Sequence, residues 1–286
     1  PENSRRGITE TQGGNLIAWN LDDHEQRIIR PNGPADGTEL RFNWNSGMAQ
    51  SPFDANTIYY GSQFLHKSID RGETWQIISD DLTTNNPEFL SYKESGGLTP
   101  ESSSAENHMT IVSISPSPVS ENVIWVGTDD GRVHVTRDGG NTWESAIDNL
   151  RRGPQGAWVP MIDPSHHNPA EAFVVFDDHR RGDNSPHVYK VENYGRSWNS
   201  LVSDDISGYA LSIRQDHMNS DLLFLGTEFG LYISVDGGQD WTKWTAGLPT
   251  VSVMDLAIQE RENDLVIGTH GRGAFIIDDY SALREL

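Results

Sequence analysis

The chain has 286 residues, enough for one large all-β unit or two ordinary domains, and its 42 acidic and 21 basic residues give a formal net charge of −21. A surface of this sign repels phosphate backbones, which excludes nucleic acid as an expected partner. The absence of cysteine excludes disulfides, thiol catalysis and cysteine-bound metal clusters. No apolar run reaches the roughly 20 residues of a membrane-spanning helix, so membrane insertion is not expected. The sequence implies no cofactor and no metal.

The N-terminal part, residues 1–39, contains two short apolar runs at 16–19 and 27–29. Runs of this length, bounded by Asn, Asp and Gly, are typical of short antiparallel strands. This part is therefore predicted to form a hairpin.

From residue 40 onward an eight-residue pattern recurs, Ser/Thr-x-Asp-x-Gly-x-Thr/Ser-Trp. Its key residues are Asp70 with Trp75, Asp138 with Trp143, Asp236 with Trp241, and, in a weaker copy, Asn193 with Trp198. A truncated fifth copy lies at 276–280. We expect the Asp to accept backbone N–H groups inside a tight turn, and the Gly to adopt a positive φ. The Trp is expected to pack between neighbouring sheets, so the pattern is interpreted as structural.

The residues around each copy also repeat, as four short strands that we call A to D in chain order. In one unit these strands are expected at 110–114, 123–128, 133–135 and 143–146. A four-stranded antiparallel unit repeated in series is typical of a β-propeller. The blades are predicted at about 40–90, 108–150, 157–203, 208–248 and 251–280, the last without strand D.

About five blades are therefore visible, and the chain, which starts at Pro1, is expected to be part of a larger ring. Residues 1–39 would supply outer strands of a preceding blade or of the closing blade. A missing part of the same chain, or a partner chain, would complete the ring. The connection 79–107 is unusually long, which is typical of a functional or a disordered loop.

The repeated pattern resembles the Asp-box (BNR) repeat, which occurs in sialidases, two-propeller xyloglucanases, photosystem assembly factors and sortilin domains. The chain is most similar to bacterial VPS10/sortilin-like "glycosyl hydrolase" BNR-repeat proteins. The segments that carry this resemblance are Asn43-Trp44-Asn45 and the glycine-bounded runs 127–131, 226–232 and 268–272. It implies a β-propeller and a secreted, periplasmic or cell-surface location. It does not specify a function, because Asp boxes occur in enzymes and in binding modules alike.

In the resembling sialidases the active face lies opposite the boxes, where the B–C turns and D–A connections meet. Catalytic carboxylates are predicted at Asp129, Asp177 and Glu228. Ligand-binding residues are predicted at Arg41, Trp44, His108, Asp130, Asp178, His179, Arg180, His270 and Arg272. The D–A connections add Glu106, Trp158 and Tyr209. Ordinary hairpin-turn chemistry also explains the Asp-Gly and Phe-Gly turns at 129–131 and 228–230, and that alternative stays open.

These residues support two hypotheses. The first is an interaction module that binds a peptide, a protein or a glycan. The second is a glycoside hydrolase, or one lobe of one, because such enzymes use paired carboxylates. The chain lacks the Arg-Ile-Pro segment of sialidases, which disfavours that activity. A scaffold without either function is a weaker third hypothesis.

Overall fold

The computed structural model describes residues 5–11, 13–88 and 107–286. Glu106 and most of the long connection at 79–107 lie outside these residues. In the part of the chain that the model describes, no helix is long and apolar enough to cross a membrane.

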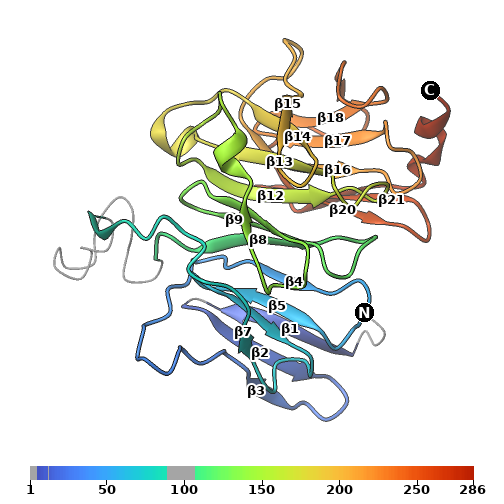
Figure 1. Cartoon of the computed structure of the whole chain (residues 1–286). Helices are drawn as coiled ribbons and strands as arrows, with labels where there is room; N and C mark the ends of the chain where they lie inside the picture. The colour runs from blue at the N-terminus through green and yellow to red at the C-terminus, as the bar shows by residue number, and fades with distance from the viewer. Residues whose placement is uncertain (1–4, 12, 89–106) are drawn as a thin grey trace. The chain divides into compact units, whose positions relative to one another are not determined.

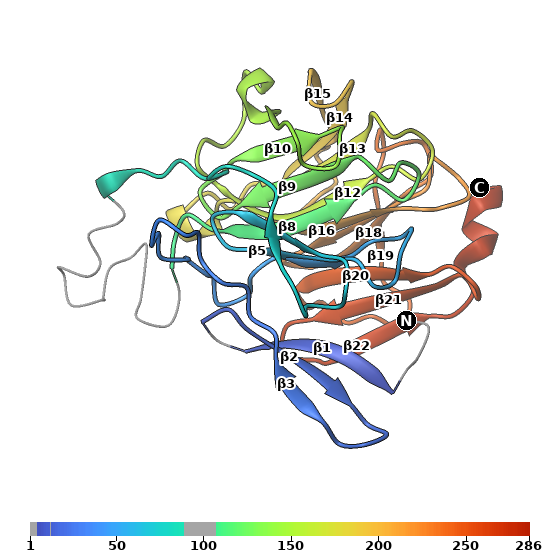
Figure 2. The same ribbon diagram turned by 60° about the horizontal axis from the view of Figure 1, so that its bottom comes forward.

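In the described residues the fold is all-β, a β-propeller of six antiparallel blades, and the helices there are short 3₁₀ turns (Figures 1 and 2). The chain divides into two compact units, 1–116 with 121–145, and 117–120 with 146–286. Each unit contains three of the sheets.

The first unit begins with a three-stranded sheet of β1 (Arg6–Thr11), β2 (Asn15–Asn20) and β3 (Gln26–Ile28). Its second sheet contains β4 (Met48–Gln50), β5 (Ile58–Gly61), β6 (Leu65–Ser68) and β7 (Gln76–Ile77). Its third contains β8 (Ile111–Pro116), β9 (Ile124–Thr128), β10 (Val133–Thr136) and β11 (Glu144–Ser145).

The second unit contains β12 (Trp158–Pro164), β13 (Ala172–Asp177), β14 (His187–Glu192) and β15 (Ser197–Ser200) in its first sheet. Its second has β16 (Ala210–Gln215), β17 (Leu223–Thr227), β18 (Gly230–Ser234) and β19 (Thr242–Trp244). Its third has three strands, β20 (Val253–Gln259), β21 (Asp264–Thr269) and β22 (Ala274–Ile277).

In the four-stranded sheets the second strand is buried along its whole length, because it has a strand on each side. Every residue of β9, β13 and β17 is buried. These are the apolar runs from which the sequence predicted strand B. Their side chains form the cores between neighbouring sheets of the same unit.

In the first unit, the repeated eight-residue turn bonds a blade to the residue that follows the last strand of the blade before it. Asp70 accepts hydrogen bonds from the backbone and the hydroxyl of Thr74, at 2.9 and 2.5 Å, which lower its pKa to about 2. Gly72 has a φ of 90° and packs against Ile29. Trp75 donates its indole N–H to the carbonyl of Ile29 at 2.7 Å.

The same contacts recur in the other copies. The indole N–H of Trp143 donates to Ile78 O at 2.8 Å, and that of Trp241 to Leu201 O at 2.9 Å. That of Trp198 donates to Ala146 O at 3.1 Å. The copy with Asn193 replaces the Asp by a residue at φ 53°, a conformation that Asn tolerates well.

The sequence predicted about five blades from residue 40 onward, and the described residues form five sheets there. Residues 6–28 form a sixth sheet of their own. The strand Arg6–Thr11 was missed, since its sequence RGITET has a single large apolar residue, Ile8, and gives no alternating pattern.

Candidate functional site

Two groups of polar side chains contain most of the predicted site residues, one group in each unit. We call them the Asp129 cluster, with Arg41, His108 and Asp130, and the Asp177 cluster, with Asp178, His179, Arg180 and Glu228.

In the Asp129 cluster, the Asp129 carboxylate follows β9 and its side chain is 1% exposed. It accepts hydrogen bonds from the backbone and hydroxyl of Thr110, both at 2.8 Å, and from the amide of Asn43 at 3.0 Å. His108 Nδ1 lies 3.6 Å from the same carboxylate. Asp129 therefore holds two distant segments of the chain against β9, and its oxygens are occupied by these partners.

Asp130, the next residue, is bonded in the same way. It accepts hydrogen bonds from the backbone N–H and the hydroxyl of Thr84, both at 2.7 Å, and from the hydroxyl of Thr128. Burial, and then the neighbouring charge of Asp129, raise the pKa of Asp130. A raised pKa is a property of a general acid, but here the carboxylate is enclosed by hydrogen-bond donors of its own chain.

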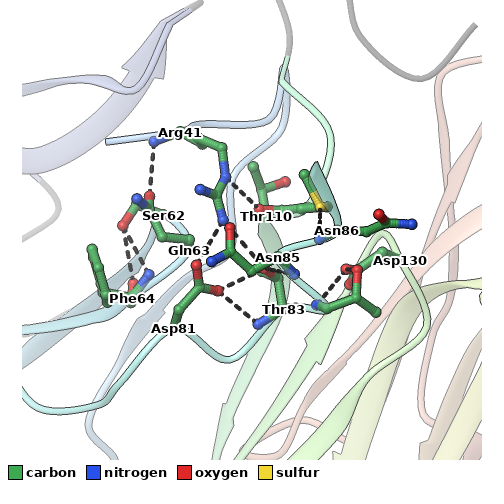
Figure 3. A network of polar contacts seen from close by, with 12 residues as sticks. Arg41, Ser62, Gln63, Phe64, Asp81, Thr83, Asn85, Asn86, Thr110 and Asp130 are labelled. Atoms are coloured by element: carbon green, nitrogen blue, oxygen red, sulfur yellow. Dashed lines mark hydrogen bonds and ion pairs between the residues drawn. The ribbon is translucent and has the colours of Figure 1, made fainter. Parts of the chain in front are cut away.

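Arg41 completes this cluster (Figure 3). Its guanidinium donates to Asp81 at 2.8 Å, to Thr83 at 3.2 Å and to the carbonyl of Met109 at 3.2 Å, while its backbone N–H donates to Gln63. The guanidinium is thus used to hold the segment after β7. Trp44, three residues on, is half exposed.

The Asp177 cluster is more exposed to solvent than the Asp129 cluster. Asp177 ends β13, and its Oδ1 accepts from the backbone N–H of His179 at 3.1 Å and lies 2.6 Å from its Nδ1. The imidazole of His179 stacks on Tyr209, with ring centroids 4.3 Å apart and planes at 14°. Tyr209 belongs to the connection that enters β16, so the pair joins two neighbouring sheets.

Glu228 lies next to Tyr209, in the turn between β17 and β18. Its backbone N–H donates to the carbonyl of Tyr209 at 3.0 Å, and its side chain lies over Gly208. The pKa of Tyr209 is raised by burial and then by the negative charges of Glu228 and Asp177.

A second stacked pair lies beside the first. The guanidinium of Arg180 is 4.1 Å from the ring centroid of Trp158, a cation–π geometry. Trp158 pairs with Asp177 across β12 and β13, which fixes this ring next to the His179 loop. The loop itself is a short 3₁₀ helix, η3 (His179–Arg181), ended by Gly182 at φ 91°. Asp178 is bonded to Arg181 inside it.

The remaining predicted residues lie apart. His270 and Arg272 are exposed in the turn between β21 and β22, which is closed by bonds from Thr269 to the carbonyl of Gly273. None of the described contacts joins their side chains to the Asp177 cluster. In the described part of the chain, no group of three or more His, Asp or Glu side chains is arranged to hold a metal.

Sequence reasoning missed the partners that enclose the Asp129 cluster. Asp81, Thr83 and Thr84 lie in the segment after β7 and bond to Arg41 and Asp130. The signal was weak, because Asp-x-Thr-Thr is an ordinary turn sequence and nothing local shows which distant residue it meets.

Comparison with known proteins supports the fold but no specific function. No family model matches the sequence, and no curated protein matches it. Among solved structures, a GH74 enzyme of Niastella koreensis superposes with a TM-score of 0.64 at 16% identity, over 98% of this chain and 44% of that chain. The GH74 xyloglucanase from Xanthomonas campestris has a TM-score of 0.62 at 16% identity, over 96% of this chain and 43% of its own. This chain thus spans less than half the length of both enzymes.

A third similar structure is described as YCF48 bound to D1 peptide. Its TM-score is 0.55 at 13% identity, over 99% of this chain and 80% of that one. At these identities the likeness concerns the propeller fold, which enzymes and peptide-binding proteins share.

Proposed function

We propose that this chain is an Asp-box (BNR) propeller of the sortilin-like type that acts outside the cytoplasm as an interaction module, and that it binds a peptide, protein or glycan at the Asp177 cluster. The observation that carries the proposal is the pair of stacks, His179 on Tyr209 and Arg180 on Trp158, beside two carboxylates. The Asp-box assignment rests on the four repeated turns and their identical indole contacts.

The chemistry of the cluster is suited to recognition. Aromatic rings fixed by stacking offer flat contact area at a small cost in conformational entropy, and Trp, Tyr and Arg are the residues that most often dominate binding energy. Asp177 and Glu228 add acceptors for hydroxyl or ammonium groups of a ligand.

The test is a binding screen of the full chain against arrays of glycans and of peptides, followed by affinity measurement for each hit. Tyr209→Ala is expected to weaken binding by at least about tenfold, because it removes the ring under His179. The matched control is Arg261→Ala, an exposed residue whose partner is its neighbour Glu262. The proposal is contradicted if Tyr209→Ala binds every hit as the wild type does.

A glycoside hydrolase is the second candidate, because the charges of Glu228 and Asp177 both contribute to the raised pKa of Tyr209 and paired carboxylates are what glycoside hydrolysis uses. The likeness to GH74 propellers makes β-glucans such as xyloglucan the first substrates to offer. Release of reducing ends that disappears in both Asp177→Asn and Glu228→Gln would establish this activity. Binding without any release leaves the interaction module as the function.

A further inference from the structure

The two carboxylates of the Asp177 cluster that lie near Tyr209 are held in different ways. Asp177 lies 2.6 Å from His179 Nδ1 and also accepts the backbone N–H of that residue. Among the residues that the structure describes, none gives a hydrogen bond or an ion pair to the carboxylate of Glu228, which is partly buried. What fixes the place of Glu228 is therefore the backbone of its turn and the surface on which its side chain lies.

The backbone of the turn is well held. The buried hydroxyl of Thr227 accepts the N–H of Phe229 at 3.2 Å and donates to the carbonyl of Gly230 at 3.2 Å. The N–H of Glu228 donates to the carbonyl of Tyr209 at 3.0 Å. These bonds set where the Cα of Glu228 lies, and the direction of its side chain then depends on the residue beneath it.

That residue is Gly208. A Cβ at this position would lie 2.8 Å from Glu228 Cβ, 2.9 Å from Phe229 Cδ2 and 3.0 Å from Glu228 Oε2, which is too close for van der Waals contact. The φ of Gly208 is 78°, a conformation that favours glycine. The preceding N–H, of Ser207, is bonded to the hydroxyl of buried Tyr232 at 3.1 Å, so the segment is held in place. A side chain at position 208 would consequently displace Glu228 and Phe229.

We propose that Gly208 is a positioning residue of the Asp177 cluster: the absence of a side chain there lets the Glu228 carboxylate lie over the backbone beside Tyr209 before a ligand arrives. Gly208 itself touches no ligand in this account and acts through Glu228. An acceptor that is already in place reduces the conformational cost of binding a donor group. This inference rests on the proposed function for the meaning of Glu228, but the position of Glu228 can be tested without a ligand.

Tyr209 reports that position. Its pKa is raised by burial first, and then by the negative charges of Glu228 and Asp177. The imidazole of His179 is stacked on its ring. If Gly208→Ala moves the carboxylate of Glu228 away, the pKa of Tyr209 is expected to fall, because less negative charge opposes its ionisation. NMR titration of the full chain with ¹³Cζ-labelled tyrosine measures this pKa.

A double-variant cycle shows whether Gly208 acts through Glu228. Glu228→Gln is expected to lower the pKa of Tyr209, and Gly208→Ala to lower it in the same direction. In the variant that carries both changes, the pKa is expected to equal that of Glu228→Gln alone, since the charge that Gly208 positions is already gone.

The matched control is Gly247→Ala. Gly247 has a φ of 71°, so the substitution introduces similar backbone strain, but no described atom lies within 4 Å of an added Cβ. The pKa of Tyr209 is expected to stay at its wild-type value in this variant. With the best hit of the glycan and peptide screen, Gly208→Ala should weaken binding at least about tenfold and Gly247→Ala less than about twofold.

Three results would overturn the proposal: a wild-type pKa of Tyr209 in Gly208→Ala, an equal fall in Gly247→Ala, or a further fall in the double variant below Glu228→Gln. If Gly208→Ala does not fold, Glu228→Asp replaces it, because its shorter side chain withdraws the carboxylate from Gly208. A wild-type pKa of Tyr209 in Glu228→Asp would then overturn the proposal.

Failure of the proposed function has a different signature. Wild-type affinity in both Glu228→Gln and Tyr209→Ala would contradict binding at the Asp177 cluster and overturn the role of Glu228 toward a ligand. The Tyr209 titration decides the positioning of Glu228 by Gly208 independently of that result.

Discussion

The Asp129 and Asp177 clusters start from the same sequence feature and end in different structures. In both, two aspartates follow the second strand of a blade, β9 in one case and β13 in the other. The Asp129 side chain is 1% exposed and bonded to Thr110 and Asn43. The Asp177 side chain is 8% exposed, and its described partner is His179 within the same turn.

The difference comes from which side chains and backbone groups bond to the carboxylates of each turn. After β9 a tight turn closes at once, and distant segments bring Thr84, Asn43 and Thr110 onto the two carboxylates. After β13 the longer loop with η3 satisfies Asp177 locally, so its neighbourhood remains open to stacked aromatic rings. One carboxylate pair is therefore held by distant segments of the chain, and the other is held by residues of its own loop.

The largest expected effect separates the two clusters by stability. Asp129→Asn should lower the free energy of unfolding by about 3 kcal/mol, since it removes charge-assisted bonds from a buried site and turns an amide toward the donors of Thr110. Asp177→Asn should cost about 1 kcal/mol or less, because one local partner is affected. Urea unfolding of both variants measures the difference. Equal losses would remove the distinction between the clusters.

A smaller effect is expected for the two arginines. Arg41→Ala should cost about 1–2 kcal/mol, because Asp81, Thr83 and the Met109 carbonyl lose a shared donor in a half-buried place. Arg180→Ala should cost about 0.5 kcal/mol, since its stack on Trp158 is exposed. Thermal and urea unfolding report both values. A larger loss for Arg180→Ala than for Arg41→Ala would contradict the comparison.

The smallest expected effect concerns how the contributions of Asp138 and Asp130 to the free energy of unfolding depend on pH. Hydrogen bonds from Thr142 lower the pKa of Asp138 to about 2 from its usual 3.8, so its contribution to stability is present above pH 3.8 and is lost as the pH falls through about 2. The raised pKa of Asp130 acts in the opposite direction, because its contribution is full below pH 3.8 and is lost as the pH rises through the raised value.

Carboxyl carbon NMR titration measures these two pKa values directly. Unfolding free energies of Asp138→Asn and Asp130→Asn between pH 2 and 6 provide the second readout. Relative to wild type, the first variant should lose its disadvantage on acidification, and the second should show the reverse trend. A pKa of Asp130 below that of Asp138 would show that the carboxylate after β9 is not buried as described.

The propeller could be predicted because the residues that form its turns are close together in the sequence and recur in each copy. Each Ser/Thr-x-Asp-x-Gly turn is closed by bonds within a few residues, such as those that Ser68 and Thr74 donate to Asp70, so the pattern alone specifies the turn. The apolar runs before each turn are buried on both faces and stand out in composition.

The candidate site could be predicted only in part, because its contacts join distant segments. Arg41 lies 40 residues from Asp81, and Asn43 lies 86 residues from Asp129. Whether an Asp-Asp turn becomes buried depends on such partners, and the spacing of residues in the sequence does not show which residues these are. The stack of His179 on Tyr209 likewise depends on how two sheets pack.

The most direct test of this account measures stability and ligand affinity on the same two variants, Asp129→Asn and Glu228→Gln, using the best hit of the glycan and peptide screen. The account predicts opposite outcomes. Asp129→Asn should lose about 3 kcal/mol of stability and keep its affinity while folded, whereas Glu228→Gln should keep its stability and lose at least about tenfold in affinity. An affinity of Glu228→Gln equal to that of the wild type, together with a loss in Asp129→Asn, would place the ligand at the wrong cluster and contradict the account.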